Sequence, residues 1–366
     1  MPVDLDLPEL HEHVTCEMLI TNACNLRCSY CIARDLPGPP MSTDIGRRAI
    51  DLTIHLAEGA KSIEFMLSGG EPLTNYPVLL DVIEYAHRRG REAYMQTSFV
   101  LKTNGTLLNP DILRLVREYS LKVVVSIDGT QVVHDQHRIA ADGQGTHETV
   151  CYNMRNLLDN HVTCSASITV HPDTAQLVRS GVQWLHDFGV DDIAVGPAYG
   201  TVEWSDAAST NLSRSLLDVA DYVRGSCSDG HWIDVSPIER DSEHVGNTLA
   251  NTWGCHAASA NLAFLPDGTI AGCSALAMLA TKVPGLILGD VFNGIDQTAT
   301  DNLMTLAQTA GVDRTACREC QTAPNCAGGC LAINYSTTGS ALIPPMVYCR
   351  TIATIPEAWR CAWGNR

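Results

Sequence analysis

Apolar runs bounded by turn residues alternate with segments of helical spacing along the first 225 residues. The runs at 15–22, 62–69, 92–104, 122–128, 164–171 and 192–197 predict strands. Helices are expected at 42–58, 75–89, 109–119, 146–160, 173–188 and about 210–225. This alternation predicts an α/β fold of parallel strands joined by right-handed helical crossovers, as an open sheet or a barrel. Ligand chemistry is then expected at the carboxyl ends of the strands.

The character of the chain changes after about residue 235. Glycines, short apolar pairs and eight of the fifteen cysteines fall within residues 255–361. The segment 265–270 carries an Asp267-Gly268 pair, which is a hairpin turn signal. We therefore predict a second, smaller unit that is stabilised by metal bound to its cysteines.

Composition narrows the class of protein. The chain has 366 residues, 45% hydrophobic and 18% charged, which is typical of a folded globular protein. Its net charge of −17 disfavours nucleic acid as a partner. The longest apolar stretches, such as 276–280, are far too short to span a bilayer, and residues 1–12 are acidic rather than a basic signal peptide. We therefore expect no membrane partner and a cytoplasmic location.

Clustered cysteines in a large chain without an export signal indicate metal rather than disulfides. Cys24, Cys28 and Cys31 follow the first expected strand directly. A structural zinc site would need a fourth protein ligand, and this segment contains no histidine. An iron–sulfur cluster with one iron left open for a substrate or cofactor accommodates three thiolates.

The Cys-x3-Cys-x2-Cys spacing, with Tyr30 before the last cysteine, resembles the radical S-adenosylmethionine (radical SAM) family. The resemblance implies a partial (β/α)6 barrel, a 4Fe–4S cluster on Cys24, Cys28 and Cys31, and S-adenosylmethionine on its open iron. In that family, reductive cleavage of S-adenosylmethionine yields a 5′-deoxyadenosyl radical. A flavodoxin- or ferredoxin-like reductant is the expected electron donor.

Three further motifs follow the next strands in the order that the family shows. The segments are 68–72 (Ser-Gly-Gly-Glu-Pro), 103–108 (Thr-Asn-Gly-Thr-Leu-Leu) and 126–129 (Ser-Ile-Asp-Gly), the last followed by 134–138. The resemblance implies that Glu71 and the Gly69–Gly70 backbone hold the methionine amino group. It places Ser126 at the ribose hydroxyls and Arg138 at the methionine carboxylate, and it puts Asn104 among the cofactor-binding residues. Lys102 stands where the family usually has glutamine.

A second cysteine pattern lies near the C-terminus. From Cys317 the spacing is Cys-x2-Cys-x5-Cys-x3-Cys, which resembles the SPASM extension of radical SAM proteins with two auxiliary 4Fe–4S clusters. The resemblance assigns the outer cluster to Cys317, Cys320, Cys326 and Cys349 and the inner cluster to Cys255, Cys273 and Cys330. Three clusters per chain are therefore expected.

The inner set lacks the additional cysteine that some relatives carry shortly after the first, because 256–262 contains none. The inner cluster could therefore have one iron without a protein ligand, or take its fourth ligand from another residue or from the substrate. His256 is the local candidate, although a hydrogen bond beside the cluster is the more usual role of such a histidine.

The expected domains are a barrel at 1–235, a small cysteine-rich SPASM domain at 236–349 and a tail at 350–366. Four of the remaining cysteines are expected to have no metal role: Cys16 and Cys164 fall in strands, Cys151 in a helix and Cys227 after one. The role of Cys361 stays open, because its place in the tail would let it fold back.

The resemblance indicates an oxidoreductase acting on a peptide or protein. Sulfatase-maturing relatives carry an aspartate after the second SPASM cysteine, whereas Ser274 follows Cys273 here. We therefore rank oxidative crosslinking of a ribosomally made precursor peptide first, and formylglycine formation in sulfatases or dehydrogenation of a small molecule as alternatives. An iron–sulfur electron carrier is a further alternative, but such a protein would not need the S-adenosylmethionine motifs.

Only about fourteen residues precede the first strand, so a leader peptide is expected to bind the barrel, the SPASM surface or a separate protein.

Overall fold

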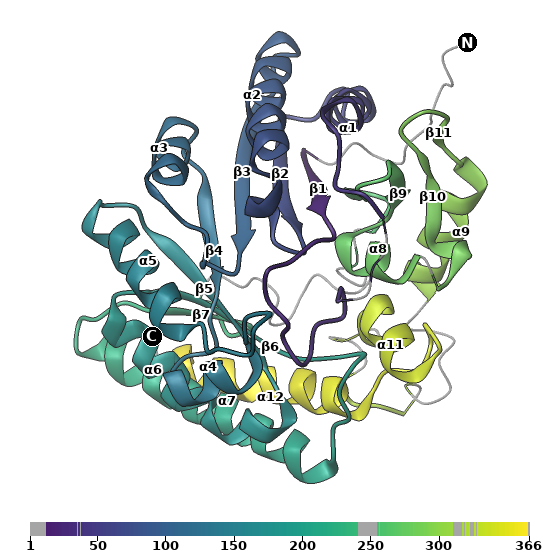
Figure 1. Ribbon diagram of the computed structural model, residues 1–366. Coiled ribbons are helices and arrows are strands. Elements are labelled where there is room, and N and C mark those ends of the chain that lie inside the picture. Colours follow the sequence, from purple (N-terminus) through teal and green to yellow (C-terminus); the bar gives the residue numbers. More distant parts are fainter. Residues whose placement is uncertain are drawn as a thin grey trace.

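The computed structural model describes residues 12–34, 36, 38–240, 255, 257–280, 282–309, 317, 319–322, 326 and 328–364. Within these residues one sheet of eleven strands organises the protein, in the order β11-β10-β9-β8-β1-β2-β3-β4-β5-β6-β7 (Figure 1). Because β11 and β7 are its two edges, the sheet is an open, partial barrel, as expected.

Seven parallel strands form the barrel part of this sheet. They are β1 (His13–Thr21), β2 (Ser62–Gly69), β3 (Gln96–Thr103), β4 (Lys122–Ser126), β5 (Cys164–Val170), β6 (Asp192–Pro197) and β7 (Asp234–Ser236). The six strands predicted from the apolar runs are all present. β3 begins four residues later than expected because the preceding helix continues to Glu92, whose carboxylate pairs with Arg88 and Arg89 in its last turn.

The helices cover the outer face of these strands (Figure 1). They are α1 (Thr43–Leu56), α2 (Tyr76–Glu92), α3 (Pro110–Glu118), α4 (Gln131–His137), α5 (His147–Asp159), α6 (Val178–Phe188) and α7 (Asp206–Ser228), with 3₁₀ turns η1 (Pro72–Asn75) and η2 (Pro172–Leu177). The side chains of Ser42 and Asn109 accept hydrogen bonds from backbone amides of the first turns of α1 and α3, so both predicted helix starts are confirmed.

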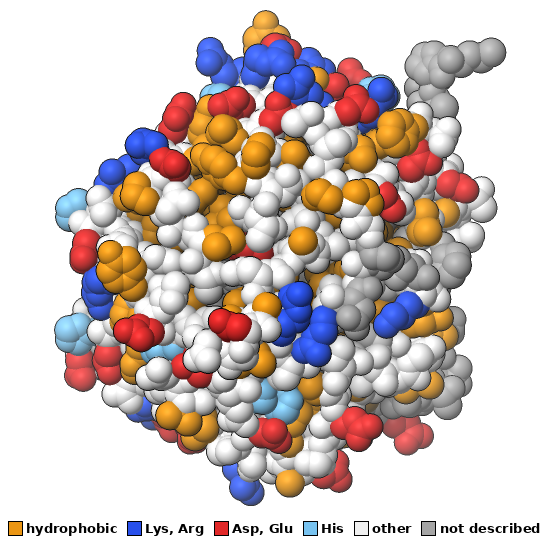
Figure 2. Space-filling view, viewed as in Figure 1, with side chains coloured by type: hydrophobic (Ala, Val, Ile, Leu, Met, Phe, Trp, Pro, Cys, Tyr) orange, Lys and Arg blue, Asp and Glu red, His pale blue; other side chains and the backbone are white. Residues whose placement is uncertain are grey.

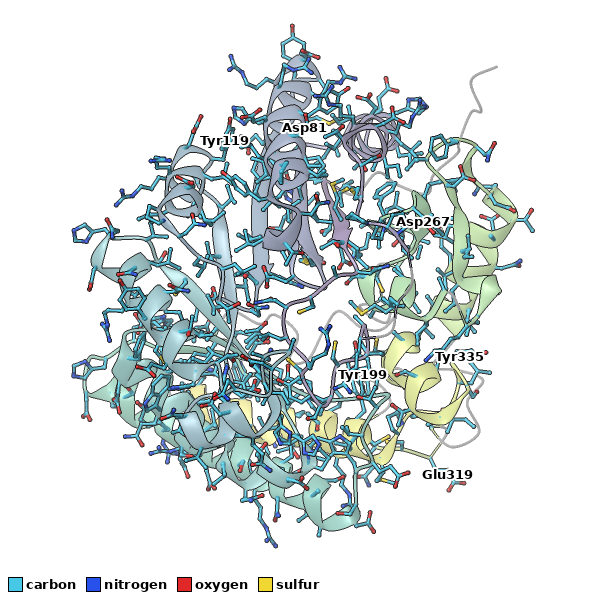
Figure 3. All side chains as sticks on the ribbon, viewed as in Figure 1. Asp81, Tyr119, Tyr199, Asp267, Glu319 and Tyr335 are labelled. Carbon is cyan, nitrogen blue, oxygen red and sulfur yellow. The ribbon has the colours of Figure 1, made fainter. Side chains whose placement is uncertain are left out.

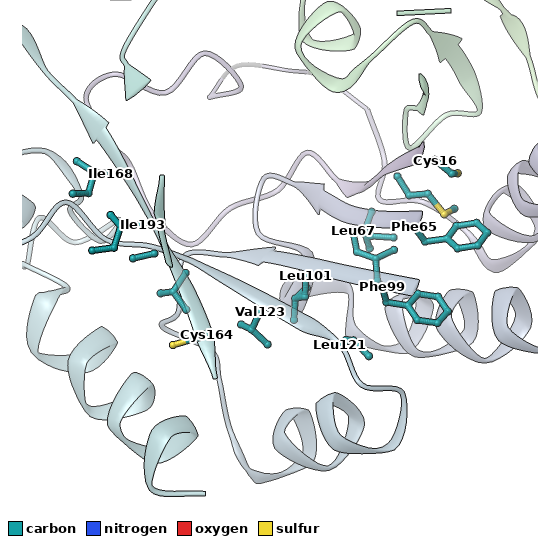
Figure 4. Close-up of a cluster of buried hydrophobic side chains, with 14 of the residues drawn as sticks. Cys16, Phe65, Leu67, Phe99, Leu101, Leu121, Val123, Cys164, Ile168 and Ile193 are labelled. Atoms are coloured by element: carbon teal, nitrogen blue, oxygen red, sulfur yellow. The ribbon is translucent and has the colours of Figure 1, made fainter. Parts of the chain in front are cut away.

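The core lies between the strands and these helices. Phe65 of β2 and Phe99 of β3 stack with their ring centres 5.7 Å apart (Figure 4). Cys16 and Cys164 are buried in the same core, as expected for cysteines without a metal role. Burial raises the pKa of Cys16 to about 12, so this thiol stays neutral.

The C-terminal unit extends the same sheet. Its strands are β8 (Asn261–Phe264), β9 (Thr269–Ala271), β10 (Ile287–Asp290) and β11 (Gly294–Ile295), and its helices are α8 (Ser274–Ala280), η3 (Pro284–Leu286), α9 (Gln297–Thr309) and α11 (Leu331–Thr338). β8 pairs in parallel with β1, and the predicted Asp267-Gly268 turn joins β8 to β9 as an antiparallel hairpin.

The expected tail at 350–366 differs from the structure. Its described residues belong to helix α12 (Met346–Trp363), which packs along α7 of the barrel. The indole groups of Trp359 and Trp363 donate to the carbonyl oxygens of Glu239 and Ile238, at 3.1 and 2.8 Å. The C-terminal helix is therefore a structural part of the barrel.

Charged side chains of both signs are interspersed over the visible face of the molecule (Figure 2). No helix in the described part of the chain is both long and apolar enough to cross a membrane.

Candidate active site

The loop after β1 places three thiols at one cavity. Cys24, Cys28 and Cys31 line a cavity of about 530 Å³ at the carboxyl ends of the barrel strands. The backbone amides of Arg27 and Ser29 donate to the carbonyl oxygens of Ile139 and His137, at 2.7 and 3.0 Å. The segment after α4 therefore holds the loop from the barrel side.

The thiols of this loop interact electrostatically. Burial raises the pKa of Cys28 to about 11, and it raises that of Cys24 as well. The charges of Cys24 and Cys31 both act on Cys28. The thiols at positions 24 and 28 therefore keep their protons at neutral pH unless a cation displaces them.

Two glycines bring the end of β2 against this loop. A Cβ on Gly69, whose φ is +128°, would lie 2.3 Å from the Thr21 carbonyl oxygen, and one on Gly70 would lie 2.3 Å from that of Ala23. No larger residue fits at either place. The backbone of both glycines therefore lines the cavity beside Cys24, where a bound ligand can reach it.

Glu71 has a different position from the one expected. Its side chain is fully buried, and it does not line the cavity. One carboxylate oxygen accepts from the Leu73 amide and the Thr103 hydroxyl, and the other accepts from the Asn104 amide at 2.7 Å. Burial raises the pKa of Glu71, while these bonds oppose that shift. The carboxylate fixes the end of β3 to the β2 loop, so its contacts assign it to the framework of the site.

We expect Glu71→Ala to lower the free energy of unfolding by about 2 kcal/mol or more, because each buried donor left without an acceptor costs about 1–3 kcal/mol. Urea unfolding followed by circular dichroism measures this change. Glu71→Gln, which keeps the volume and one acceptor oxygen, is the milder control. If the Glu71→Ala protein kept its stability but lost affinity for S-adenosylmethionine, the result would show that the carboxylate binds the ligand.

Asp128 is the central acceptor of the opposite wall. It accepts from Arg138 at 2.9 and 3.0 Å, from the Tyr30 hydroxyl at 2.6 Å and from the Thr169 amide at 2.9 Å. Arg138 and Asp128 are 6% and 3% exposed, and the Arg138 guanidinium lies over the Tyr30 ring. Asp128 was not among the residues predicted from the sequence, although its position after the fourth strand is a signal that could have identified it.

Arg138 both pairs with Asp128 and faces the cavity. Its Nε and Nη2 atoms bind Asp128, and Nη2 also donates to Thr169, yet the side chain lines the cavity. Paired with Asp128, Arg138 has a pKa above its usual value and stays charged. Tyr30, Asn104 and Ser126 line the same cavity, so the structure brings together all the residues predicted around the first cysteine cluster except Glu71.

Asn104 connects the third strand to the cysteine loop. Its side-chain amide donates to the Asn25 side-chain oxygen at 2.9 Å and lies 3.8 Å from the Cys24 sulfur. A sulfur that accepts such a contact is stabilised as a thiolate. Asn104 therefore acts on the cysteine loop as well as on the cavity.

The C-terminal cysteines form two neighbouring groups. The charges of Cys255 and Cys330 act on Cys273, while those of Cys317, Cys320 and Cys326 act on Cys349. Tyr348 interacts with members of both groups. These groups are the inner and outer sets expected from the sequence. The expectation for His256 lies outside the described residues.

Tyr199 connects the cavity with the inner set. Tyr199, which is labelled in Figure 3, lines the cavity. The charges of Cys273 and Cys330 act on its hydroxyl. Ser274 and Met278 of α8 line the cavity as well, directly after Cys273. The cavity is therefore shared between the barrel strands and the C-terminal unit.

Known proteins resemble this chain in sequence and in fold. Residues 18–180 match the Radical SAM superfamily. A serine-type anaerobic sulfatase-maturating enzyme of Klebsiella aerogenes is 23% identical over 317 residues, which cover 85% of this chain and 77% of that enzyme. Across the first matched relatives, the chain spans 59% to 79% of the relative's own length.

Two solved structures share the fold. Native anSMEcpe with bound AdoMet superposes with a TM-score of 0.78 at 18% identity, covering 95% of this chain and 96% of that one. Streptococcus suis SuiB bound to the precursor peptide SuiA has a TM-score of 0.61 at 13% identity, covering 92% and 75%. Residues 18–180 are therefore a radical SAM domain, and the chain as a whole is similar to the anaerobic sulfatase maturases.

Proposed function

We propose that this enzyme is a peptide maturase that oxidatively crosslinks side chains of a ribosomally made precursor peptide. The observation that carries the proposal is the shared cavity, because Cys24, Arg138 and Ser274 line it together. A substrate side chain in this cavity contacts both the radical-generating loop and the residues beside the inner cysteine set. A one-electron oxidation needs this proximity between the reacting carbon and an electron acceptor.

The cysteines present fit iron–sulfur clusters. The first set offers three thiols at one cavity, and the outer set offers four. We assign a SPASM domain to the C-terminal unit and three 4Fe–4S clusters to the chain on these donor sets. When bound, the first cluster together with S-adenosylmethionine supplies a 5′-deoxyadenosyl radical that removes one hydrogen atom from the substrate.

The residues of the chain hold the reactants in place. The Gly69–Gly70 backbone and Arg138 line the cavity, and we assign to them the methionine end of S-adenosylmethionine, where the Arg138 charge would face the methionine carboxylate. Asp128 fixes the orientation of Arg138 through two hydrogen bonds. The wall formed by Tyr199, Ser274 and Met278 separates the cavity from the inner cysteines, and we assign substrate positioning to it.

Formation of formylglycine in a sulfatase is the second candidate function. The sequence relationship to a serine-type maturase over 85% of this chain favours it. Ser274 disfavours it, because a hydroxyl does not act as a general base at neutral pH as a carboxylate does. A flavodoxin- or ferredoxin-like reductant is proposed for either function.

Mass spectrometry of a precursor peptide, encoded beside the enzyme, after anaerobic turnover tests the proposal. We expect a loss of about 2 Da per event, as one hydrogen atom leaves to the deoxyadenosyl radical, one proton to solvent and one electron to an auxiliary cluster. Fragmentation between the joined residues should be suppressed, and an aldehyde-reactive hydrazine should give no adduct.

The same assay separates the alternatives. Oxidation of serine to formylglycine also removes about 2 Da, but that product reacts with the hydrazine and fragments normally. A product of unchanged mass that carries one solvent deuteron would indicate epimerisation and contradict crosslinking. The triple variant Cys24→Ala, Cys28→Ala, Cys31→Ala is the control, because it should leave the precursor peptide unmodified.

A further inference from the structure

Glu17 is a buried carboxylate to which the proposed function gives no role. It lies in the middle of β1 and is 7% exposed. Within the described residues, its side chain has no hydrogen bond or ion pair. Buried carboxylates are normally paired or bound to a metal, because removal of the charge from water is costly. The carboxylate of Glu17 is therefore available to bind a ligand.

The strand pairing places Glu17 beside the inner cysteine set. Glu17 is in register with Ala263 of β8, and Ala263 is in register with Ala271 of β9. Cys273 follows β9 after one further residue and precedes α8. Leu19, on the same face of β1 as Glu17, belongs to one buried apolar cluster with these two alanines and with Ala277 of α8. The face of β1 that carries Glu17 thus points toward the unit that contains Cys273.

Electrostatic contacts give the same placement. The charge of Glu17 acts on the Cys273 thiol and on the Tyr199 hydroxyl. Tyr199 is also affected by Cys273 and Cys330. The charges of Glu17, Cys273 and Cys330 therefore all act on one partly buried tyrosine.

The inner set supplies three thiolates, whereas a 4Fe–4S cluster has four irons to ligate. We propose that a carboxylate oxygen of Glu17 is the fourth protein ligand of the inner auxiliary cluster. This inference rests on the proposed function, since it requires that cluster. A carboxylate is a harder donor than a thiolate, so the iron bound to Glu17 is the one most easily lost or exchanged.

Iron analysis and electron paramagnetic resonance test the proposal without a turnover assay. The triple variant lacking Cys24, Cys28 and Cys31 serves as the parent, and it should hold about eight irons, four for each auxiliary cluster. In this parent, Glu17→Ala should lower the iron to about seven and give the signal of a three-iron cluster in the oxidised protein. Glu17→Cys should restore about eight irons and remove that signal.

The matched control is Glu64→Gln. Glu64 lies on the neighbouring strand β2, on the same face as the cavity residue Ser68, and is only partly buried. It should leave iron content and spectrum unchanged. Glu17→Gln keeps the volume of the side chain and should give the same iron content and spectrum as Glu17→Ala. Agreement between the two variants would exclude a folding defect as the cause of the iron loss.

Two results would overturn the proposal. Equal iron content and spectra in the parent, Glu17→Ala and Glu17→Gln would show that Glu17 does not bind the cluster. If the parent held only about four irons and replacement of Cys255, Cys273 and Cys330 by alanine left that number unchanged, the inner cluster itself would be absent, and the error would lie in the proposed function.

Discussion

Replacing Cys24, Cys28 and Cys31 together with alanine is expected to abolish cleavage of S-adenosylmethionine. These thiols line the cavity and are the only ligands that the first loop provides for iron within the described residues. With four irons per cluster, the variant should lose about a third of the roughly twelve irons per chain after anaerobic reconstitution. Iron and sulfide analysis, together with chromatography of 5′-deoxyadenosine, measures both effects.

Replacement of the core cysteines is the matched control. Cys16→Ala and Cys164→Ala remove thiols of the same chain that lie in the apolar core, away from the cavity. Iron content should not change in either variant, although a small loss of stability is expected. Zinc in place of iron in anaerobically prepared protein would contradict the whole assignment of the site.

The second large effect is expected from Asp128→Ala. This change leaves the Arg138 guanidinium buried without its bidentate partner, and removal of one member of a buried ion pair costs about 3–5 kcal/mol. Tyr30 and the Thr169 amide also lose their acceptor. We expect a large fall in the urea midpoint and weakened binding of S-adenosylmethionine by the protein that remains folded.

A double-mutant cycle isolates the ion pair. Asp128→Asn and Arg138→Met, each alone and then together, should be strongly non-additive, because the double variant no longer buries an unpaired charge. Additive losses would mean that the two side chains stabilise the fold independently. A surface pair such as Arg48 with Asp44 provides the comparison and should contribute less than about 1 kcal/mol.

The sequence predicted the elements whose pattern is local. The strands at 62–69 and 192–197 match the structure at both ends, because each is a short apolar run bounded by turn residues. The resemblance to the SPASM extension likewise divides the C-terminal cysteines into two sets, and the members of each set interact in the structure. Both kinds of signal lie within a few neighbouring residues.

The features that sequence reasoning missed depend on partners far along the chain. The carboxylate of Glu71 is held by groups at the end of β3, and Asp128 accepts hydrogen bonds from groups of three separate segments. Helix α12 was missed because Pro356 lies inside it, and an interior proline normally argues against a helix. Its packing along α7 compensates for that cost, and such packing is not visible in the local pattern.

The pairing of β1 on both sides has a consequence for biosynthesis. Cys16 is in register with Phe65 of β2 and with Leu262 of β8, so one edge of this strand is completed only when a much later part of the chain has been made. Until then, the nascent protein exposes an apolar strand edge, which can pair with other chains. Long-range pairing of this kind also slows folding. Production of soluble enzyme should therefore respond strongly to slower translation, lower temperature and added chaperones.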